Sequence, residues 1–182
     1  MSVDWGRYPA GERLKDGRPV TVRKIRPDDK QRVLEAFHTL LPETIYTRLF
    51  EYKDDLSETE LAWLTEIDFV SVVGLVVTQG TGDNEVIIAS GRYFVFDGDD
   101  GRRHAEVAFV VEEDFQGMGI AGMLLRHLTT IARQQGIASF EAEVLPVNKA
   151  MLKVLAKSGL PVRKQPAGDT VQITLDLTEQ TA

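Results

Sequence analysis

The residues Gln116–Gly122, with the sequence Gln-Gly-Met-Gly-Ile-Ala-Gly, have the composition of a loop that binds an anion. They lie between a run of strand-forming residues, Glu106–Val111, and a stretch with apolar residues at helical spacing that begins at Met123. Glycines let the backbone approach a ligand closely, and the N–H groups and dipole of a helix N-terminus favour phosphate oxygens. We therefore expect this loop to bind a ligand that carries a pyrophosphate group.

A carboxylate that could act as a base lies in the run before this loop. Glu106 is flanked by apolar residues, and the alternation of a strand places it on the same face as Ala108 and Val110. Partial loss of solvent there would raise its pKa towards the range of a general base. Glu143, on a neighbouring strand, is the second candidate. The alternative for Glu106 is a surface residue on an edge strand or a residue paired with a nearby arginine.

The elements that must position these residues follow from the apolar periodicity and the turn residues. We expect a loose N-terminal arm over residues 1–18 and one domain over residues 19–178. The first half of the domain is predicted to contain a strand near 20–25, a helical stripe over 33–41, helices that begin near 42 and 57, and strands near 71–78, 86–96 and 105–111. Consecutive strands with tight turns indicate an antiparallel meander.

The second half of the domain alternates between helices and strands. Its expected elements are a helix near 119–135, a strand near 139–145, a helix over 148–157, and strands near 162–165 and 171–177. The prediction is an α/β (α+β) fold with one mixed, mostly antiparallel sheet flanked by helices. One central βαβ unit in this sheet carries the pyrophosphate loop.

The composition excludes several classes of function. The chain has no cysteine, which excludes disulfides, thiolate metal sites and a catalytic thiol, and its three histidines show no ligand spacing, so no metal is expected. The net charge of −7 argues against nucleic acid and suits a cationic amine. Without about eighteen consecutive apolar residues or a signal peptide, no membrane association is expected and a cytoplasmic location is predicted.

Three interpretations of the glycine loop compete. Gly117–Gly122 satisfies the dinucleotide pattern G-x-G-x-x-G, but that pattern should follow the first strand of a series of parallel βαβ units, and here it follows an antiparallel meander. A nucleotide P-loop is disfavoured because no Gly-Lys-Ser/Thr follows. The second interpretation, after these nucleotide-binding patterns, is a purely structural role in which the glycines only permit a tight turn. The third interpretation depends on the residues downstream of the loop.

The segment Gln116–Ala121, between a hydrophobic strand and a leucine-rich helix, resembles motif A of the GNAT acyltransferases, Q/R-x-x-G-x-G/A. Glu141–Val144 is similar to the next strand of that family, and Asn148, Met151 and Leu155 with Gly159-Leu160 are similar to its following helix. The order of elements is also similar over residues 20–177. The front of the chain resembles one branch, the acetyltransferase domain of bacterial Pat-type protein lysine acetyltransferases, over residues 22–29, 41–50, 61–68 and 105–111.

The resemblance implies acetyl-CoA as a co-substrate. Its pyrophosphate would bind the backbone of the glycine loop, and its pantetheine arm would bind the preceding strand as an added strand does. Many family members have a tyrosine that protonates the thiolate, but Leu155 stands at that position, so no tyrosine acid is expected. The residues expected to contact acetyl-CoA are Phe109, Val110, Val111, Gln116, Gly117, Met118, Gly119, Ile120, Ala121, Gly122 and Asn148.

The expected reaction is direct attack of a primary amine on the thioester in a ternary complex, with Glu106 as the general base. The resemblance favours a protein lysine side chain as the acceptor. A small-molecule amine of the polyamine, aminoglycoside or amino-acid type is the first alternative, and a CoA-binding sensor module without catalysis is the second. A protein substrate would need an open acidic groove, whereas a small amine would need a closed pocket lined by residues 40–70.

Overall fold

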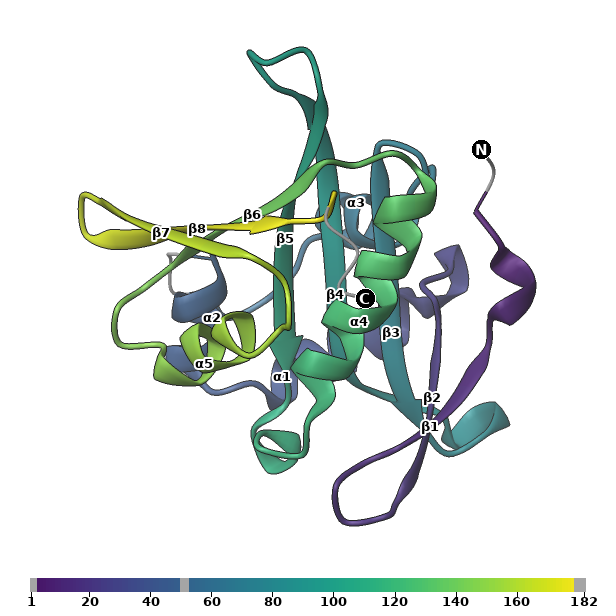
Figure 1. Ribbon diagram of the computed structural model, residues 1–182. Helices are drawn as coiled ribbons and strands as arrows, with labels where there is room; N and C mark the ends of the chain where they lie inside the picture. Colours follow the sequence, from purple (N-terminus) through teal and green to yellow (C-terminus); the bar gives the residue numbers. More distant parts are fainter. Residues whose placement is uncertain (1–2, 50–52, 179–182) are drawn as a thin grey trace.

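The computed structural model describes residues 3–49 and 53–178 of the 182-residue chain. Among these residues, eight strands form one sheet in the order β1-β2-β3-β4-β5-β6-β8-β7 (Figure 1). Every neighbouring pair is antiparallel except β5 and β6, which are parallel. The strands are β1 (Ala10–Arg13), β2 (Pro19–Lys24), β3 (Val72–Gln79), β4 (Val86–Asp97), β5 (Arg103–Val111), β6 (Ser139–Val144), β7 (Val162–Ala167) and β8 (Thr170–Asp176).

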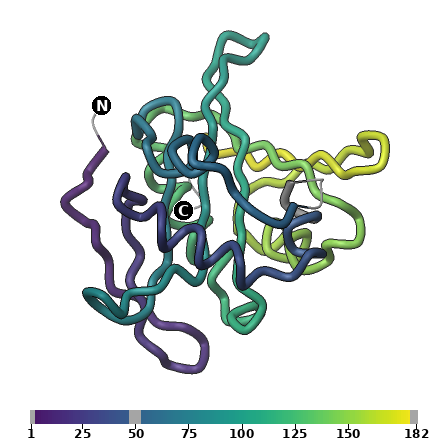
Figure 2. The backbone as a smooth tube through the Cα atoms, turned by 180° about the vertical axis from the view of Figure 1, so that it is seen from behind, coloured from purple at the N-terminus to yellow at the C-terminus, as the bar shows by residue number. Residues whose placement is uncertain are grey.

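Helices lie on both faces of the sheet. The rear view shows the first three α-helices in front of the sheet, whereas α4 lies in front of β3 and β4 in the opposite view (Figures 1 and 2). The α-helices are α1 (Lys30–Thr39), α2 (Pro42–Leu49), α3 (Glu58–Thr65), α4 (Ile120–Gln134) and α5 (Lys149–Ala156). Short 3₁₀ turns are η1 (Trp5–Arg7), η2 (Pro27–Asp29), η3 (Gly82–Asn84) and η4 (Glu113–Phe115).

The predicted fold class is confirmed. The strands β3 to β5 form the expected antiparallel meander, and α4 connects the parallel pair β5 and β6 as the single central crossover. The helix expected to begin near 57 is α3, and a capping box starts it: the Glu60 N–H donates to Ser57 Oγ at 3.2 Å, and the Ser57 N–H donates to the Glu60 carboxylate at 2.8 Å. These paired bonds satisfy backbone donors that the first turn would otherwise leave free.

The expected loose arm at the N-terminus is in part a strand. Residues 10–13 form β1, which pairs with β2 from Ala10 opposite Val22 to Arg13 opposite Pro19. Leu14, directly after β1, is buried in the main core. The strand was not predicted because it is only four residues long and two of them, Glu12 and Arg13, are charged, as is common on an edge strand. A distant partner holds one of them, since Glu12 accepts hydrogen bonds from Arg126 and His127 of α4.

The position of α4 is fixed by its apolar face. The residues predicted to be core on this helix are at most 6% exposed, and they pack in the main hydrophobic cluster against the sheet: Met123, Leu124, Leu125, Leu128 and Ile131. Burial of each such side chain stabilises the fold by about 1.5–3 kcal/mol. Because the helix cannot shift on the sheet without losing this packing, the glycine loop at its N-terminus is held at the end of β5.

A buried ion-pair network fixes the start of α1 on the sheet. The Arg23 guanidinium of β2 forms a two-point contact with Asp29, with both nitrogen–oxygen distances 2.8 Å, and it also donates to Glu85 at 2.8 Å. The Asp29 side chain is fully buried, and its Oδ2 also accepts from the Arg26 N–H. Although burial would raise the pKa of Asp29, these hydrogen bonds hold it below its usual range.

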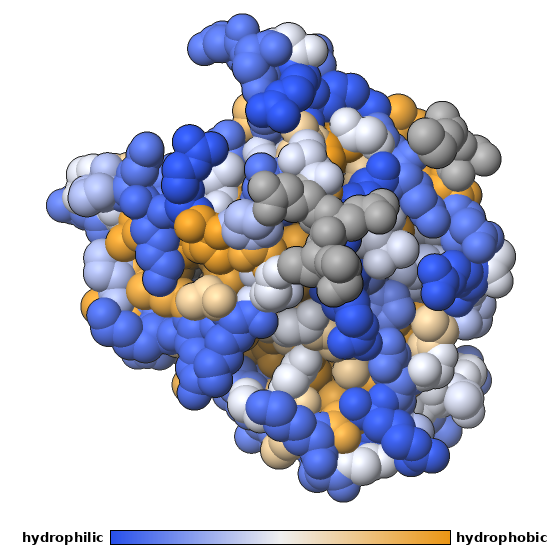
Figure 3. Space-filling model, in the orientation of Figure 1, coloured by the Kyte–Doolittle hydropathy of each residue, from blue (hydrophilic) through white to orange (hydrophobic). Residues whose placement is uncertain are grey.

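The surface on the α4 side is hydrophilic for the most part. Hydrophobic side chains gather between the β7–β8 hairpin and α5 in the space-filling view (Figure 3), where partly buried residues such as Val154, Val162 and Val171 pack against the core. Among the described helices, none combines the length and apolar character that crossing a membrane requires.

Candidate functional site

A slot opens where β5 and β6 separate. The two strands pair only from His104 to Glu106 on β5, opposite Ser139 to Glu141 on β6. Beyond that point, β5 keeps β4 on one side and faces the slot on the other. The slot has a volume of about 60 Å³ and is lined by Glu106, Val107, Ala108, Phe109, Ala142, Glu143, Val144, Asn148, Met151 and Leu155. An extended ligand arm could bind the free backbone edge of β5 there as an added strand does.

The glycine loop follows the end of β5. Gly117 and Gly119 have φ angles of 77° and 87°, which side chains rarely tolerate, and Gly119 is the N-cap of α4. The first helical hydrogen bond runs from the Met123 N–H to the Gly119 carbonyl at 3.0 Å. The backbone N–H groups before Met123 in this turn therefore have no acceptor within the helix. A Cβ added at Gly117 or Gly122 would meet no atom within 4 Å. The loop is therefore open, and its backbone N–H groups are accessible to an anion such as a phosphate group.

Two of the predicted contact residues already have partners within the chain. The Gln116 side-chain amide donates to the Val111 carbonyl at 3.1 Å, so it ties the loop back to the end of β5. The Asn148 side chain caps α5 by accepting from the Met151 N–H at 3.1 Å, and it also lines the slot. Leu155, at the position expected for a tyrosine acid, is fully buried and lines the slot from α5.

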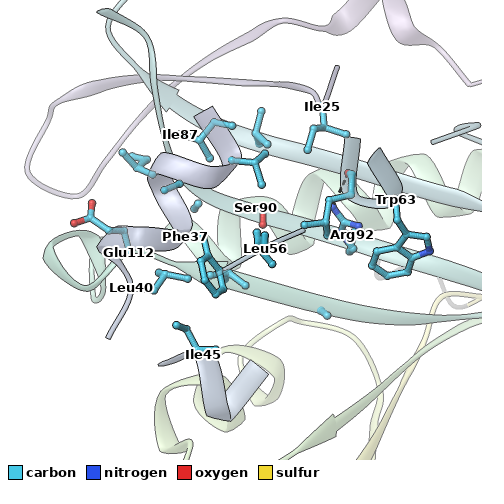
Figure 4. A pocket seen from close by; sticks show the side chains of 18 of the residues that line it. Ile25, Phe37, Leu40, Ile45, Leu56, Trp63, Ile87, Ser90, Arg92 and Glu112 are labelled. Carbon is cyan, nitrogen blue, oxygen red and sulfur yellow. Dashed lines mark hydrogen bonds between the residues drawn. The ribbon is translucent and has the colours of Figure 1, made fainter. Parts of the chain in front are cut away.

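A larger cavity lies on the face of β4 and β5 that is opposite α4, beneath α1, α2 and α3 (Figure 4). Its volume is about 440 Å³, within the range of small-molecule sites. The polar residues on its wall are Ser90, Arg92, Glu106 and Glu112. The remaining lining residues are apolar: Ile25, Val33, Ala36, Phe37, Leu40, Ile45, Leu56, Trp63, Leu64, Val76, Ile87, Ile88, Ala89, Phe94, Ala108 and Val110.

Glu106 stands where the slot and the cavity meet. Glu106 and Ala108 are the two residues that line both of these spaces. The predicted strand face is observed, since Val110 lines the same cavity. The expectation that Glu106 is partly desolvated was wrong, because its side chain is exposed. Among the described residues it has no hydrogen-bond or ion-pair partner, and β5 lies in the interior of the sheet.

The arginines that could have paired with Glu106 are engaged elsewhere. Arg102 bonds to Asp100 at 2.8 Å, and Arg103 donates to the Gln135 carbonyl at 3.1 Å. The second candidate base, Glu143, lines the slot but not the cavity, and it accepts from the Thr170 hydroxyl at 2.6 Å. Of the two carboxylates, only Glu106 faces both spaces.

Sequence reasoning missed a second carboxylate on the cavity wall. Glu112 is half-buried at one side of the cavity, with Arg92 and Trp63 at the other (Figure 4). Burial and the neighbouring charges of Asp114 and Glu113 raise the pKa of Glu112. The signal was present in the sequence, because the alternation that relates 106, 108 and 110 continues to position 112.

Sequence reasoning also missed two cationic residues, one on the cavity wall and one beside the glycine loop. Arg92 is 6% exposed on the cavity wall, donates to the Leu64 carbonyl at 3.0 Å and lies over the Trp63 ring at 5.6 Å from its centroid. Lys15 reaches the glycine loop from the β1–β2 turn, where its backbone N–H donates to the Met118 carbonyl at 3.2 Å. In the part of the chain that the structure describes, no cluster of three His, Asp or Glu side chains could hold a metal ion.

Comparison with known proteins identifies the family. Residues 33–160 match the acetyltransferase (GNAT) family. The chain is 32% identical over 151 residues to acetyltransferase Pat of Mycolicibacterium smegmatis, covering 83% of this chain and 44% of Pat, so it spans less than half of that relative. It is 26% identical over 159 residues to acetyltransferase PA5475 of Pseudomonas aeruginosa, covering 87% of this chain and 84% of PA5475.

The fold agrees with this match. The solved GNAT domain of S. lividans PAT is 35% identical, with a TM-score of 0.82, and the match covers 92% of this chain and 96% of that domain. The glycine loop, the slot between β5 and β6 and the base candidate on β5 all lie within the matched residues. The chain therefore belongs to the acetyltransferase (GNAT) family.

Proposed function

We propose that this chain transfers the acetyl group of acetyl-CoA to the side-chain amine of a protein lysine, by direct attack with Glu106 as the general base. One observation carries the proposal: Glu106 lines both the slot between β5 and β6 and the larger cavity. A base for this reaction must reach an acceptor amine that approaches from one space while the thioester is held in the other. Geometry of this kind is the first requirement for a general base.

The residues that would hold the donor follow from the same geometry. The backbone of Gln116–Gly122 and the N-terminus of α4 would bind the pyrophosphate. The free edge of β5 from Val107 to Phe109 would bind the pantetheine amides within the slot. The thioester would then lie near Ala108, at the junction of the two spaces.

The chemistry requires a neutral amine. A lysine ammonium with a pKa of about 10.4 is almost fully protonated at neutral pH, so Glu106 must accept its proton directly or through water. The amine nitrogen then attacks the thioester carbonyl, a C–N bond forms, the C–S bond breaks and the CoA thiolate leaves. A simple thiol has a pKa of about 8.5, so the thiolate can leave and take a proton from water. No tyrosine is among the described residues that line either space.

The acceptor class is supported by two features. The sequence resembles Pat-type protein lysine acetyltransferases over residues 22–29, 41–50 and 61–68, and these ranges contribute Ile25, Ile45, Trp63 and Leu64 to the cavity lining. A lysine side chain also suits the cavity, because its four methylene groups can contact apolar walls while its nitrogen reaches the carboxylate of Glu106.

A small apolar amine is the second candidate. The specific observation is the roof of the cavity, where Leu40, Ile45, Leu56, Trp63 and Leu64 lie within the range 40–70 that was expected to line the pocket of a small substrate. The volume of about 440 Å³ also exceeds what one lysine side chain fills. The cavity walls therefore favour an amine with an apolar body over a polycation such as a polyamine.

The release of free CoA would separate these acceptors. The purified chain is incubated with acetyl-CoA and either lysine-bearing proteins or small amines that differ in their apolar portion. Activity on proteins supports the lysine proposal. Activity confined to free amines would overturn it in favour of the second candidate. If no free CoA is released with either set of acceptors although acetyl-CoA still binds, a sensor without catalysis is favoured.

A further inference from the structure

The turn between β1 and β2 packs against the glycine loop. In the ribbon and in the backbone tube the turn lies beside the segment that leads into α4 (Figures 1 and 2). Two contacts fix it there: the Lys15 N–H donates to the Met118 carbonyl at 3.2 Å, and the Arg18 guanidinium lies 5.0 Å from the centroid of the Phe115 ring. The N-terminal hairpin is therefore part of the surroundings of the loop, although it lies about a hundred residues away in the sequence.

The Lys15 side chain runs alongside the N-cap of α4. A Cβ added at Gly119 would lie 3.4 Å from Lys15 Cε, 3.6 Å from Cγ and 3.9 Å from Cδ. The ammonium nitrogen is bonded to Cε, so it lies at the same end of the helix. Gly119 itself has no side chain that could cap the helix, and its φ of 87° presents the backbone at this point.

This placement is unfavourable unless an anion is bound. The N-terminus of a helix carries a partial positive charge, and a cation there destabilises the helix. Neighbouring arginines have carboxylate partners: Arg18 bonds to Asp16 at 2.7 Å and Arg126 to Glu12 at 2.8 Å. Lys15 has no ion-pair partner within residues 3–49 and 53–178. An ammonium and a helix N-terminus that face the same open loop form a site for a doubly charged anion.

We propose that Lys15 binds a phosphate of CoA, so that the N-terminal hairpin supplies a cation to the donor site. The inference rests on the proposed function only in taking CoA as the ligand, and it is independent of the acceptor. The phosphate can be that of the pyrophosphate or the 3′-phosphate of the ribose. Both have the same chemistry, and truncated ligands distinguish them.

The test is calorimetric titration of the whole chain with CoA. Lys15→Gln should weaken CoA binding by about three- to tenfold, within the range for a solvent-exposed charge pair that gains from a doubly charged partner. Lys15→Arg should restore most of the affinity. The matched control is Lys164→Gln, which removes one exposed lysine from β7 at the opposite edge of the sheet and should leave the affinity unchanged.

Truncated ligands locate the phosphate. Loss of affinity for both CoA and dephospho-CoA assigns Lys15 to the pyrophosphate, whereas loss for CoA alone assigns it to the 3′-phosphate. Pantetheine, which has no phosphate, should bind both proteins equally. A second readout is the stability of the ligand-free protein, because Lys15→Gln removes a cation from the positive end of α4 and should raise Tm by about 1 °C.

Three results would overturn the inference. One is equal CoA affinity in the wild type and Lys15→Gln. Another is an equal loss for pantetheine, which would show that the substitution only disturbs the hairpin. If the wild-type chain itself did not bind CoA, the donor assignment and the proposed function would fail together.

Discussion

Replacing Glu106 by glutamine separates catalysis from folding. The amide keeps the shape of the side chain but cannot accept the proton of the acceptor amine. Since the Glu106 side chain is exposed and has no partner among the described residues, the free energy of unfolding should change by less than about 0.5 kcal/mol. Turnover should fall by about 10²–10⁴, the usual contribution of a general base. Affinity for acetyl-CoA should remain, because the glycine loop and the slot backbone are unchanged.

The pH dependence of the residual activity sharpens this prediction. With an amine of pKa about 10.4, only about one acceptor in a thousand is neutral at pH 7.4. Without its base, the enzyme depends on that fraction, so kcat/KM of Glu106→Gln should rise about tenfold per pH unit between pH 7 and 9. The activity of the wild type should rise less steeply over the same range, since its base removes the proton during the reaction. Initial rates of CoA release at several pH values measure both slopes.

The matched control is Glu143→Gln. That residue is also an exposed carboxylate at the slot, but it bonds to Thr170 and does not line the cavity. Its loss should change turnover by less than about threefold, as for other surface substitutions. If Glu106→Gln is unimpaired while Glu143→Gln is inactive, the assignment of the base is wrong. If neither variant is impaired, proton removal by water alone is the better account.

Three further variants test other parts of the structure. Gly119→Glu should abolish acetyl-CoA binding in calorimetry, because it forces a side chain into a left-handed conformation and puts negative charge at the phosphate loop; binding at wild-type affinity would refute the loop assignment. Asp29→Ala should cost about 3–5 kcal/mol in urea unfolding, since it removes the two-point partner of the buried Arg23 guanidinium and leaves Glu85 as its remaining carboxylate. Because the pKa of Asp29 is lowered in the folded state, this difference should be complete above pH 5 and shrink as the pH falls through that pKa. Glu112→Gln should stabilise the fold slightly at pH 7, because the raised pKa means that ionisation costs stability as the pH rises above about 4.3; the gain should vanish below pH 4.

Local patterns in the sequence were sufficient to predict most of the fold. The strands β3, β4 and β5 are indicated by runs of apolar residues and by the glycine-rich turns between them, and α4 by its apolar stripe. The hairpin of β1 gave no such signal. Its strand is held by pairing with β2 and by bonds from Glu12 to residues of α4 that are 114 and 115 positions away. No pattern within residues 1–18 contains that information.

In the candidate site too, local features could be predicted from the sequence and features that depend on tertiary packing could not. The glycine loop was found because its chemistry resides in consecutive residues, and Glu106 because it interrupts an apolar run. The cavity could not be predicted from the sequence, since its walls combine side chains from three helices and three strands. The placement of Glu106 beside the cavity depends on how α1, α2 and α3 lie over the sheet, and the sequence predicts the existence of these helices but not their positions.

The strand β5 connects folding with catalysis through its alternation. On one face, Val107 and Phe109 are buried in the core beneath α4, and on the other, Glu106 and Ala108 line the cavity. A shift of the β5 register by one residue would exchange these faces, placing the carboxylate in the core and the apolar side chains at the site. Nine paired positions between β4 and β5, from Ala89 opposite Val111 to Asp97 opposite Arg103, oppose such a shift. The pairing that stabilises the sheet therefore also fixes where the proposed base meets the donor. Substitutions in α1, α2 and α3 could change which acceptor the cavity takes without disturbing this geometry.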